Sequence, residues 1–207
     1  ILLYGPPGIG KTTLSNIVAQ ELKGELRVTS GPAIEKTGDL AAILTNLKDN
    51  DVLFIDEIHR LPRAVEEALY PVMEEYMLDI VIGKGPAARI MRLPVPRITI
   101  IGATTRLAML SAPLRDRFGM LLRLDYYKQS DMAEIVRRSA KLLSIPLHES
   151  AVMEVVMRAR GTPRIANRFL KRARDYYQVN KMKEVTLDVV DKLFELLGID
   201  KRGLHEM

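Results

Sequence analysis

The stretch GPPGIGKTT, residues 5–13, decides the fold of this 207-residue chain. It contains three glycines, two prolines and one lysine. It follows a short apolar run, ILLY at residues 1–4, and its end overlaps a segment from Lys11 to Leu22 whose apolar residues recur at helical spacing. A strand before the pattern G-x-x-x-x-G-K-[ST] and a helix after it turn a weak signal into a specific one. We therefore expect a phosphate-binding loop.

The chemistry of such a loop explains its composition. Its glycines let successive backbone N–H groups point inward and bind an anion at the start of a helix. Lys11 is then expected to reach the β- and γ-phosphates of a nucleotide, and the Thr12 hydroxyl to ligate magnesium. The alternative, a glycine-rich turn without function, is disfavoured because a second half of the site follows about 40 residues later.

That second half is VLFIDEIHR, residues 52–60. An apolar strand that ends in Asp56 and Glu57 supplies one carboxylate for the magnesium and another to orient or deprotonate a water molecule. Two roles need two carboxylates, so the pair fits nucleotide hydrolysis. We interpret His59 as a hydrogen-bonded structural histidine rather than a catalytic one.

The chain around these motifs predicts an α/β fold with a parallel sheet. Short apolar runs separated by helical patterns are typical of buried parallel strands, and one such helical pattern covers Arg63 to Tyr76. The runs are ILLY at 1, LRVT at 26, VLFI at 52, ITII at 98 and LLRL at 121.

Strand signals stop after residue 127, and amphipathic helical patterns follow. We therefore expect a P-loop α/β domain at 1–127 and a small helical domain at 128–207, with a hinge at Asp125–Ser130. The first helix is expected to open with Asp131 and Glu134 in capping-box spacing. The expected helices cover 131–143, 150–160, 163–178 and 186–197.

One stretch interrupts the alternation of strands and helices. Two extended runs, Leu78–Ile82 and Arg89–Leu93, flank a Gly-Lys-Gly-Pro turn at 83–86, which predicts an inserted β-hairpin at about 78–93. Its apolar side chains either pack on the protein's own core or form an exposed docking face.

Three further motifs carry polar residues suited to phosphate chemistry. Thr105 ends the strand in GATTR at the sheet edge where ligands of parallel sheets bind, a signal that is weak alone. Arginine matches phosphate oxygens with a permanent charge. The segment SAPLRDRFG at 111–119 offers Arg115 and Arg117, and GTPR places Arg164 in the first turn of a helix. For Arg115 an ion pair with Asp116 is an equally good explanation. If one of these arginines acts on the nucleotide of a neighbouring subunit, the active form must be an oligomer.

Composition limits the class of protein. With 47% apolar and 28% charged residues and a net charge of +5, the chain has the composition of a globular protein. It has no cysteine and no apolar run long enough for a bilayer, so we expect a cytoplasmic enzyme. Residues 158–174 include seven basic residues and no acidic one. Two interpretations stay open, a solvated helix face and a phosphate-binding surface.

Taken together, GPPGIGKTT, VLFIDEIHR, IGATTR, APLRDRFG and RGTPRIANR resemble the AAA+ ATPases, and within them the RuvB family of Holliday-junction branch-migration motors. The resemblance covers essentially the whole chain. The more specific signals are TSGP at 29–32, DEIHR, the DIVIGKGP hairpin and RGTPRIANR.

The resemblance implies a role for each motif. Glu57 would be the catalytic carboxylate, Thr105 sensor 1, Arg117 an arginine finger for the adjacent subunit and Arg164 sensor 2. Asp56 and Thr12 would hold Mg²⁺. The residues expected to bind ATP or ADP are Gly5, Pro6, Pro7, Gly8, Gly10, Lys11, Thr12, Thr13, Asp56 and Arg164. The hairpin would dock on the third domain of RuvA, the junction-binding partner, through Ile80, Ile82, Ile90 and Met91.

The implied function is ATP-dependent branch migration of Holliday junctions in recombination, DNA repair and the SOS response, by a hexameric ring that acts with RuvA. The family's adenine-packing amino-terminal segment and its DNA-gripping winged-helix domain lie outside these 207 residues. Two alternatives stay open: another AAA+ ATPase of the clamp-loader type, and a nucleotide-binding assembly module without turnover. A protein unfoldase is disfavoured because residues 32–51 contain no aromatic residue for a pore loop.

Overall fold

The computed structural model describes residues 1–82 and 89–204. These residues form two compact units. The α/β unit comprises residues 1–5 and 11–124, and the helical unit comprises residues 6–10 and those from Asp125 on. Residues 6–10 of the phosphate loop therefore group with the helices, although they precede the first helix of the α/β unit.

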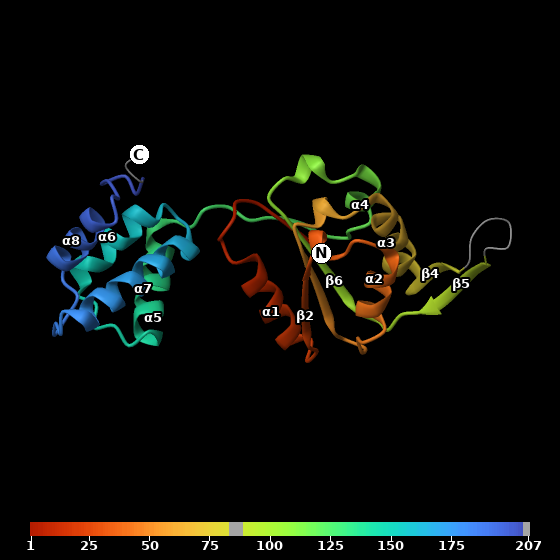
Figure 1. The fold of residues 1–207 in the computed structure, drawn as a ribbon, viewed down its shortest axis with the longest axis horizontal. Coiled ribbons are helices and arrows are strands. Elements are labelled where there is room, and N and C mark those ends of the chain that lie inside the picture. Colours follow the sequence, from red (N-terminus) through yellow and green to blue (C-terminus); the bar gives the residue numbers. More distant parts are fainter. Residues whose placement is uncertain (83–88, 205–207) are drawn as a thin grey trace. The chain divides into compact units, whose positions relative to one another are not determined.

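The α/β unit is built on a five-stranded sheet in the order β2-β3-β6-β1-β7, with every pair parallel. This confirms the predicted parallel α/β fold followed by helices. Parallel neighbouring strands cannot be joined by a tight turn, so the chain returns over a face of the sheet between them, usually as a helix. The strands are β1 (Leu2–Tyr4), β2 (Leu26–Ser30), β3 (Val52–Asp56), β6 (Thr99–Thr104) and β7 (Leu121–Arg123). Strands β2 and β6 of this sheet are labelled in Figure 1.

Both faces of this sheet are covered by helices, as parallel sheets require. Alternate strand residues point to opposite faces, so Leu2 joins one core and Leu3 the other. Helix α1 (Lys11–Glu21) covers the face of Leu3, Phe54 and Ile101. Helices α2 (Thr37–Leu44) and α3 (Arg63–Glu75) cover the opposite face.

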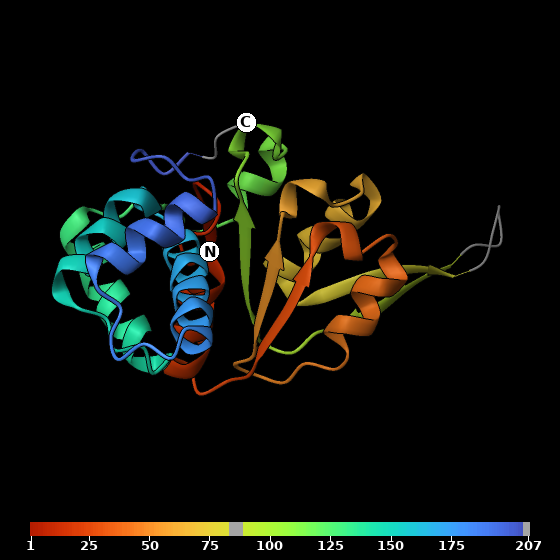
Figure 2. The same ribbon diagram turned by 60° about the vertical axis from the view of Figure 1, so that its left-hand side comes forward.

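Strands β4 (Met77–Ile82) and β5 (Arg89–Pro94) pair with each other antiparallel and project from the α/β unit (Figure 2). Near the unit, Leu78 is 1% exposed and packs in the core of α2 and α3. Farther out, Val81 and Ile90 face each other across the ladder and are 65% and 72% exposed. The expected turn at 83–86 lies outside the described residues.

The helical unit packs four helices around one apolar core. At its centre Phe169 and Phe194 meet edge to face, with ring centres 4.9 Å apart. The helices are α5 (Gln129–Leu142), α6 (Glu149–Ala159), α7 (Pro163–Val179) and α8 (Leu187–Leu196).

Local structure differs from the prediction in three places. Helix α5 begins at Gln129 with Lys128 as its N-cap residue, so Asp131 lies inside the first turn rather than at a capping box. Two short helices, α2 and α4 (Ala112–Asp116), were not predicted. Helix α2 has only eight residues, and α4 only five, so neither gives a clear helical period.

Candidate functional site

The predicted lysine is the first residue of α1 and is only 8% exposed. Its Nζ donates a hydrogen bond to the Gly5 carbonyl at 2.9 Å, and the buried Ser15 hydroxyl donates to the Lys11 carbonyl at 3.0 Å. The ammonium group therefore lies over the first residue of the loop. Thr12 and Thr13 are exposed at the start of the same helix.

The glycines of the loop are needed for its shape. Gly8 and Gly10 have φ values of +80° and +98°, which side chains with a Cβ rarely adopt. The Arg164 backbone N–H donates to the Gly8 carbonyl at 3.1 Å, and a Cβ on Gly8 would lie 2.9 Å from the Cβ of Arg164. Within the helical unit, the loop thus lies against the first turn of α7, next to an expected site residue.

Asp56 and Glu57 follow the buried strand β3 at the carboxyl edge of the sheet. The Asp56 carboxylate accepts a hydrogen bond from the Glu57 backbone N–H at 3.0 Å. Glu57 has φ +46°, an uncommon left-handed conformation for a non-glycine residue. Its side chain is 45% exposed and forms an ion pair with Arg60 at 2.9 Å. A strained, exposed carboxylate at a strand end is a frequent feature of functional sites.

The neighbouring strand β6 ends at the same edge. Thr104 is 1% exposed and shares a 2.9 Å hydrogen bond with Nδ1 of His59, as expected for a structural histidine. Thr105 follows and is exposed. The Gly5 backbone N–H donates to the Thr104 carbonyl at 3.2 Å, so the phosphate loop begins beside the expected sensor strand.

Arg117 is held by α3 and α4 of the α/β unit. Its Nε lies 3.1 Å from Oε1 of Glu74, and its guanidinium carbon lies 4.2 Å from the centre of the Tyr70 ring. Arg115 forms the ion pair with Asp116 that the sequence left open, at 3.6 Å.

The helical unit has a pocket of about 550 Å³ beside the phosphate loop. Arg164, the expected site residue, lines it with Arg160, Tyr126 and Tyr127. Gly161 is needed there, because a Cβ would lie 2.8 Å from the Tyr127 carbonyl. Sequence reasoning missed the two tyrosines, because the YY pair only marks the end of the strand signals, and it placed Arg160 only within the basic run at 158–174. Their common pocket with Arg164 becomes visible only in the folded helical unit.

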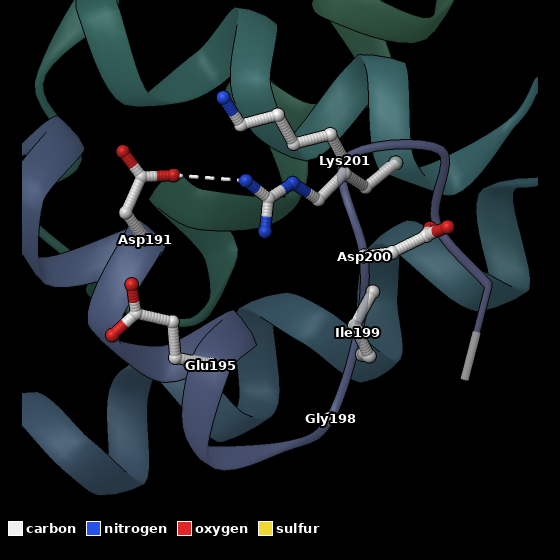
Figure 3. Close-up of a pocket in the computed structure, with 7 residues that line it drawn as sticks. Asp191, Glu195, Gly198, Ile199, Asp200 and Lys201 are labelled. Atoms are coloured by element: carbon white, nitrogen blue, oxygen red, sulfur yellow. Dashed lines mark hydrogen bonds and ion pairs between the residues drawn. The ribbon is translucent and has the colours of Figure 1, made fainter. Parts of the chain in front are cut away.

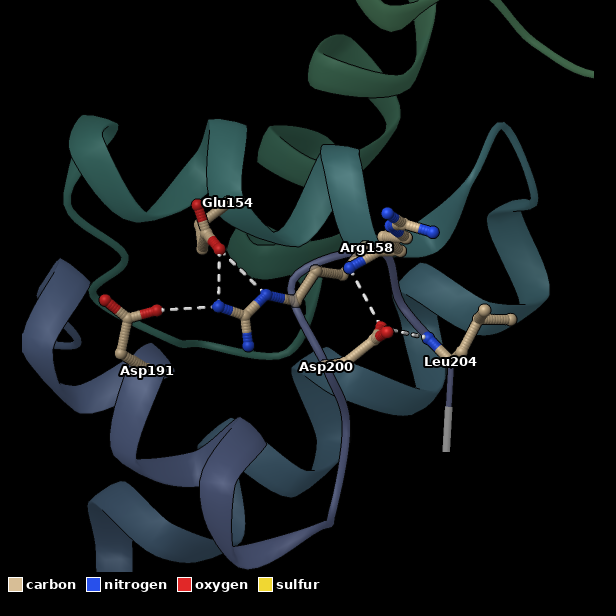
Figure 4. Close-up of polar contacts among 6 residues, drawn as sticks. Glu154, Arg158, Asp191, Asp200 and Leu204 are labelled. Carbon is tan, nitrogen blue, oxygen red and sulfur yellow. Dashed lines mark hydrogen bonds and ion pairs between the residues drawn. The ribbon is translucent and has the colours of Figure 1, made fainter. Parts of the chain in front are cut away.

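The basic run at 158–174 is not one surface. Arg158 is 5% exposed and forms ion pairs with Glu154 at 2.6 Å and Asp191 at 2.9 Å (Figure 4). Its guanidinium carbon also lies 4.2 Å from the centre of the Phe194 ring. A second pocket, of about 520 Å³, is lined by Arg158. Asp191 and Glu195 of α8 and the loop that follows this helix line the same pocket (Figure 3). Arg158 therefore acts inside the helical unit and contributes no charge to a phosphate surface.

The hairpin residues fall on two faces. Residues opposite each other in an antiparallel ladder share a face, so Ile80 lies with Met91, and Ile90 lies with Val81 on the other side. Ile80 packs partly against the core, whereas Ile90 is 72% exposed and Met91 41%. Ile82 pairs with Arg89, and its side chain lies outside the described part of the structure.

Within residues 1–82 and 89–204, no group of three or more His, Cys, Asp or Glu side chains could by itself hold a metal ion. Across the same residues, no helix is long and apolar enough to span a bilayer.

Comparison with known proteins gives one result throughout. The family model described as the Holliday junction DNA helicase RuvB P-loop domain matches residues 1–124, and the RuvB AAA lid domain matches residues 127–200. Holliday junction branch migration complex subunit RuvB from Dehalococcoides mccartyi (strain CBDB1) is 59% identical over 207 residues, which is 100% of this chain and 59% of the relative. The subunit from Chloroflexus aggregans (strain MD-66 / DSM 9485) is 60% identical over 205 residues, covering 99% of this chain and 59% of the relative.

Solved structures agree with this. The Thermotoga maritima RuvB Holliday junction branch migration motor is 47% identical, with a TM-score of 0.86 over 99% of this chain and 64% of that chain. A point variant of the same protein has a TM-score of 0.89 at the same identity and coverage. The chain thus spans less than two thirds of the length of these relatives.

Proposed function

This chain belongs to the RuvB family, and from that premise we propose that it is the ATPase core of a motor that drives Holliday-junction branch migration in recombination and repair. The observation that carries the proposal is the sheet edge of the α/β unit. There the buried Lys11 at the start of α1 and the acidic pair after β3 follow strands of one parallel sheet. Ligands of open parallel sheets bind at this edge.

The residues at this edge fit ATP and Mg²⁺. Backbone N–H groups of the glycine loop and the Lys11 ammonium bind phosphate oxygens, and the Thr12 hydroxyl and Asp56 carboxylate are the hard oxygen ligands that Mg²⁺ prefers. Held by Thr12 and Asp56, Mg²⁺ would supply positive charge that offsets the charge of the phosphates. Lys11 donates to the Gly5 carbonyl in this structure, so it exchanges one oxygen acceptor for another when nucleotide binds.

Glu57 carries the hydrolytic step. Its carboxylate accepts a hydrogen bond from the attacking water and orients it in line with the bond to the leaving group. Thr105, which directly follows β6, is expected to hydrogen-bond the attacking water or the γ-phosphate. Arg60, which pairs with Glu57 at 2.9 Å, is exposed and can release the carboxylate at little cost. Arg164, in the first turn of α7, lies next to Gly8 of the phosphate loop within the helical unit and is proposed as a ligand of the phosphates that this loop would bind.

Hydrolysis depends on a second copy of the chain. Arg117 is partly exposed and carries a permanent charge, so it can serve as a finger that reaches the nucleotide of the adjacent subunit in a hexameric ring. Such a ring, working in the cytoplasm where ATP and the chromosome are found, would move duplex DNA with RuvA at the junction.

The first test separates binding from turnover. Lys11→Ala removes the phosphate-binding charge, so nucleotide binding should be lost in calorimetric titration. Glu57→Gln keeps the shape of the site and removes the base, so ATP should bind while turnover stops. Equal affinity and equal turnover in both variants and the parent would refute the site assignment. Binding without turnover in the parent itself would favour the nucleotide-binding assembly module.

The second test addresses the hairpin as the surface for the third domain of RuvA. Ile90 is 72% exposed, so Ile90→Asp should abolish saturable binding of that domain in calorimetry without loss of stability. Leu142→Asp on α5 is a matched control, because Leu142 is 76% exposed in the helical unit. Binding that survives Ile90→Asp would exclude this face of the hairpin. An absence of binding to the folded parent would favour an AAA+ ATPase of another type.

A further inference from the structure

The Arg117 side chain is enclosed on three sides by residues of α3 and α4. The Tyr70 ring lies under the guanidinium at 4.2 Å, the Glu74 carboxylate lies 3.1 Å from Nε, and the Pro113 carbonyl accepts a hydrogen bond from Nη1 at 3.0 Å. Tyr70 and Glu74 are four residues apart on α3, so both face the same side of that helix. We call the pair of Tyr70 and Glu74 the arginine cradle.

A second set of contacts fixes the cradle itself. The Tyr70 hydroxyl donates a hydrogen bond to the Glu66 carboxylate at 2.7 Å, and the Ser111 hydroxyl donates to the same carboxylate. Ser111 is also the N-cap of α4, where it accepts from the Leu114 backbone N–H at 3.2 Å. Glu66 therefore ties α3, which holds the cradle, to α4, which precedes Arg117.

Burial raises the pKa of the Tyr70 hydroxyl, and its hydrogen bond to Glu66 acts in the same direction. The hydroxyl therefore stays protonated near neutral pH and keeps donating to the carboxylate, which holds the ring in place.

The geometry leaves part of the guanidinium free for another molecule. A guanidinium has five N–H donors, and the cradle and Pro113 engage only the Nε side and Nη1. The Arg117 side chain remains 28% exposed. A long side chain that is hydrogen-bonded at Nη1, lies beside a carboxylate and packs over one ring face loses most of its rotational freedom before it meets a ligand. Such preorganisation lowers the barrier of a step that needs a donor at a fixed point.

We propose that Tyr70 and Glu74 are positioning residues that preset Arg117 for the phosphates of a nucleotide bound by the adjacent copy of this chain. The proposal rests on the proposed function, because it requires Arg117 to act between subunits. It adds two residues of α3 that contact no nucleotide and that act through the arginine.

A positioning role across a subunit boundary makes a distinctive prediction: the cradle matters in the subunit that donates Arg117 and not in the subunit that holds the ATP. A role in folding alone would matter in both. The reference experiment mixes Lys11→Ala subunits, which keep Arg117, with Arg117→Ala subunits, which keep an intact nucleotide site. ATP turnover should reappear in the mixed rings, whose composition native mass spectrometry verifies.

The test then places Tyr70→Leu in one partner at a time. In the donor, Lys11→Ala with Tyr70→Leu should restore less than one tenth of the reference turnover, with the KM for ATP unchanged within twofold. In the acceptor, Arg117→Ala with Tyr70→Leu should restore the full reference turnover. Glu74→Gln should show the same asymmetry with a smaller loss, because the ring contact remains.

Two controls sharpen the result. Tyr70→Phe keeps the ring under the guanidinium and should restore at least half of the reference turnover from the donor. Glu67→Gln removes an exposed α3 carboxylate that pairs with Arg63 at 2.9 Å and does not contact Arg117, so the donor should be unaffected.

Each outcome has one meaning. Equal loss in donor and acceptor would overturn the positioning role, and so would full turnover from the Tyr70→Leu donor. No recovery in the reference mixture would overturn the arginine finger between subunits and, with it, the cradle.

Discussion

Arg117 in the α/β unit and Arg158 in the helical unit each place a guanidinium carbon 4.2 Å from the centre of an aromatic ring, Tyr70 and Phe194 respectively. Their surroundings differ. Arg158 meets two carboxylates and its side chain is 6% exposed, whereas Arg117 meets one carboxylate and is 28% exposed.

This difference separates a structural arginine from one available to a partner. A buried charge must be compensated within the fold, and Arg158 is compensated by Glu154 and Asp191. Arg117 keeps part of its guanidinium in solvent, so its remaining donors are available to a phosphate. The ring contact alone does not distinguish the two roles; the number of carboxylates and the exposed fraction do.

The largest expected effect is on turnover at Arg117. Arg117→Ala should lower ATP turnover in the ring by roughly 10³- to 10⁵-fold, about 4 to 7 kcal/mol of barrier. The free energy of unfolding should change by about 1 kcal/mol or less, because the lost contacts are partly exposed. Steady-state turnover and urea denaturation measure the two quantities. A large loss of stability with normal turnover would reverse the assignment.

The opposite result is expected at Arg158. Arg158→Ala leaves Glu154, whose side chain is 16% exposed, without its cation, so the free energy of unfolding should fall by about 3 kcal/mol. The value is at the low end for buried pairs because Asp191 is 44% exposed and regains water. Arg172→Ala is the control, since that arginine is 62% exposed and should change stability by about 0.5 kcal/mol or less. Equal urea midpoints for the two variants would contradict the structural role.

The smallest effect on stability is expected at a third arginine, whose side chain is more exposed than those of Arg117 and Arg158. Arg137 lies on the surface, 3.1 Å from the Glu149 carboxylate through its Nε, and its hydrogen bond lowers the pKa of Glu149 below the usual 4.5. A carboxyl group whose pKa is lower in the folded than in the unfolded protein stabilises the fold at any pH above its unfolded-state pKa. This stabilisation is lost as the pH falls through the folded-state pKa. Arg137→Gln should return the Glu149 pKa to its usual range in carboxyl NMR titration and slightly lower the free energy of unfolding near neutral pH, and this difference should disappear as the pH falls through the folded-state pKa. An unchanged pKa would show that the pair does not persist in solution.

The sequence was sufficient for the sheet and for placing the lysine and the acidic pair at the ends of its strands. Short runs of four or five apolar or β-branched residues and the GKT and DE motifs carry local signals that do not depend on distant contacts. It was insufficient for the two arginines compared above. Arg158 lies in a run of basic residues, and only its packing against α8 brings Asp191 to it. The arginine cradle likewise contacts Arg117, which lies more than 40 positions away in the sequence.

The hairpin illustrates a partial prediction. Two extended runs on either side of a glycine-proline turn motif in the sequence located its strands, but the register decides which side chains meet. Ile80 faces the protein's own core, and Ile90 faces solvent beside Val81. Both residues are apolar and lie in extended runs, so composition could not separate them.

The most direct test of the motor is the ATP-dependent dissociation of a synthetic four-way DNA junction by this protein together with RuvA. We expect the parent protein to convert the junction to two duplexes only when ATP is present, and Glu57→Gln to bind ATP and leave the junction intact. Junction dissociation by Glu57→Gln at the parent's rate would contradict the account, because movement would then not depend on hydrolysis at this site.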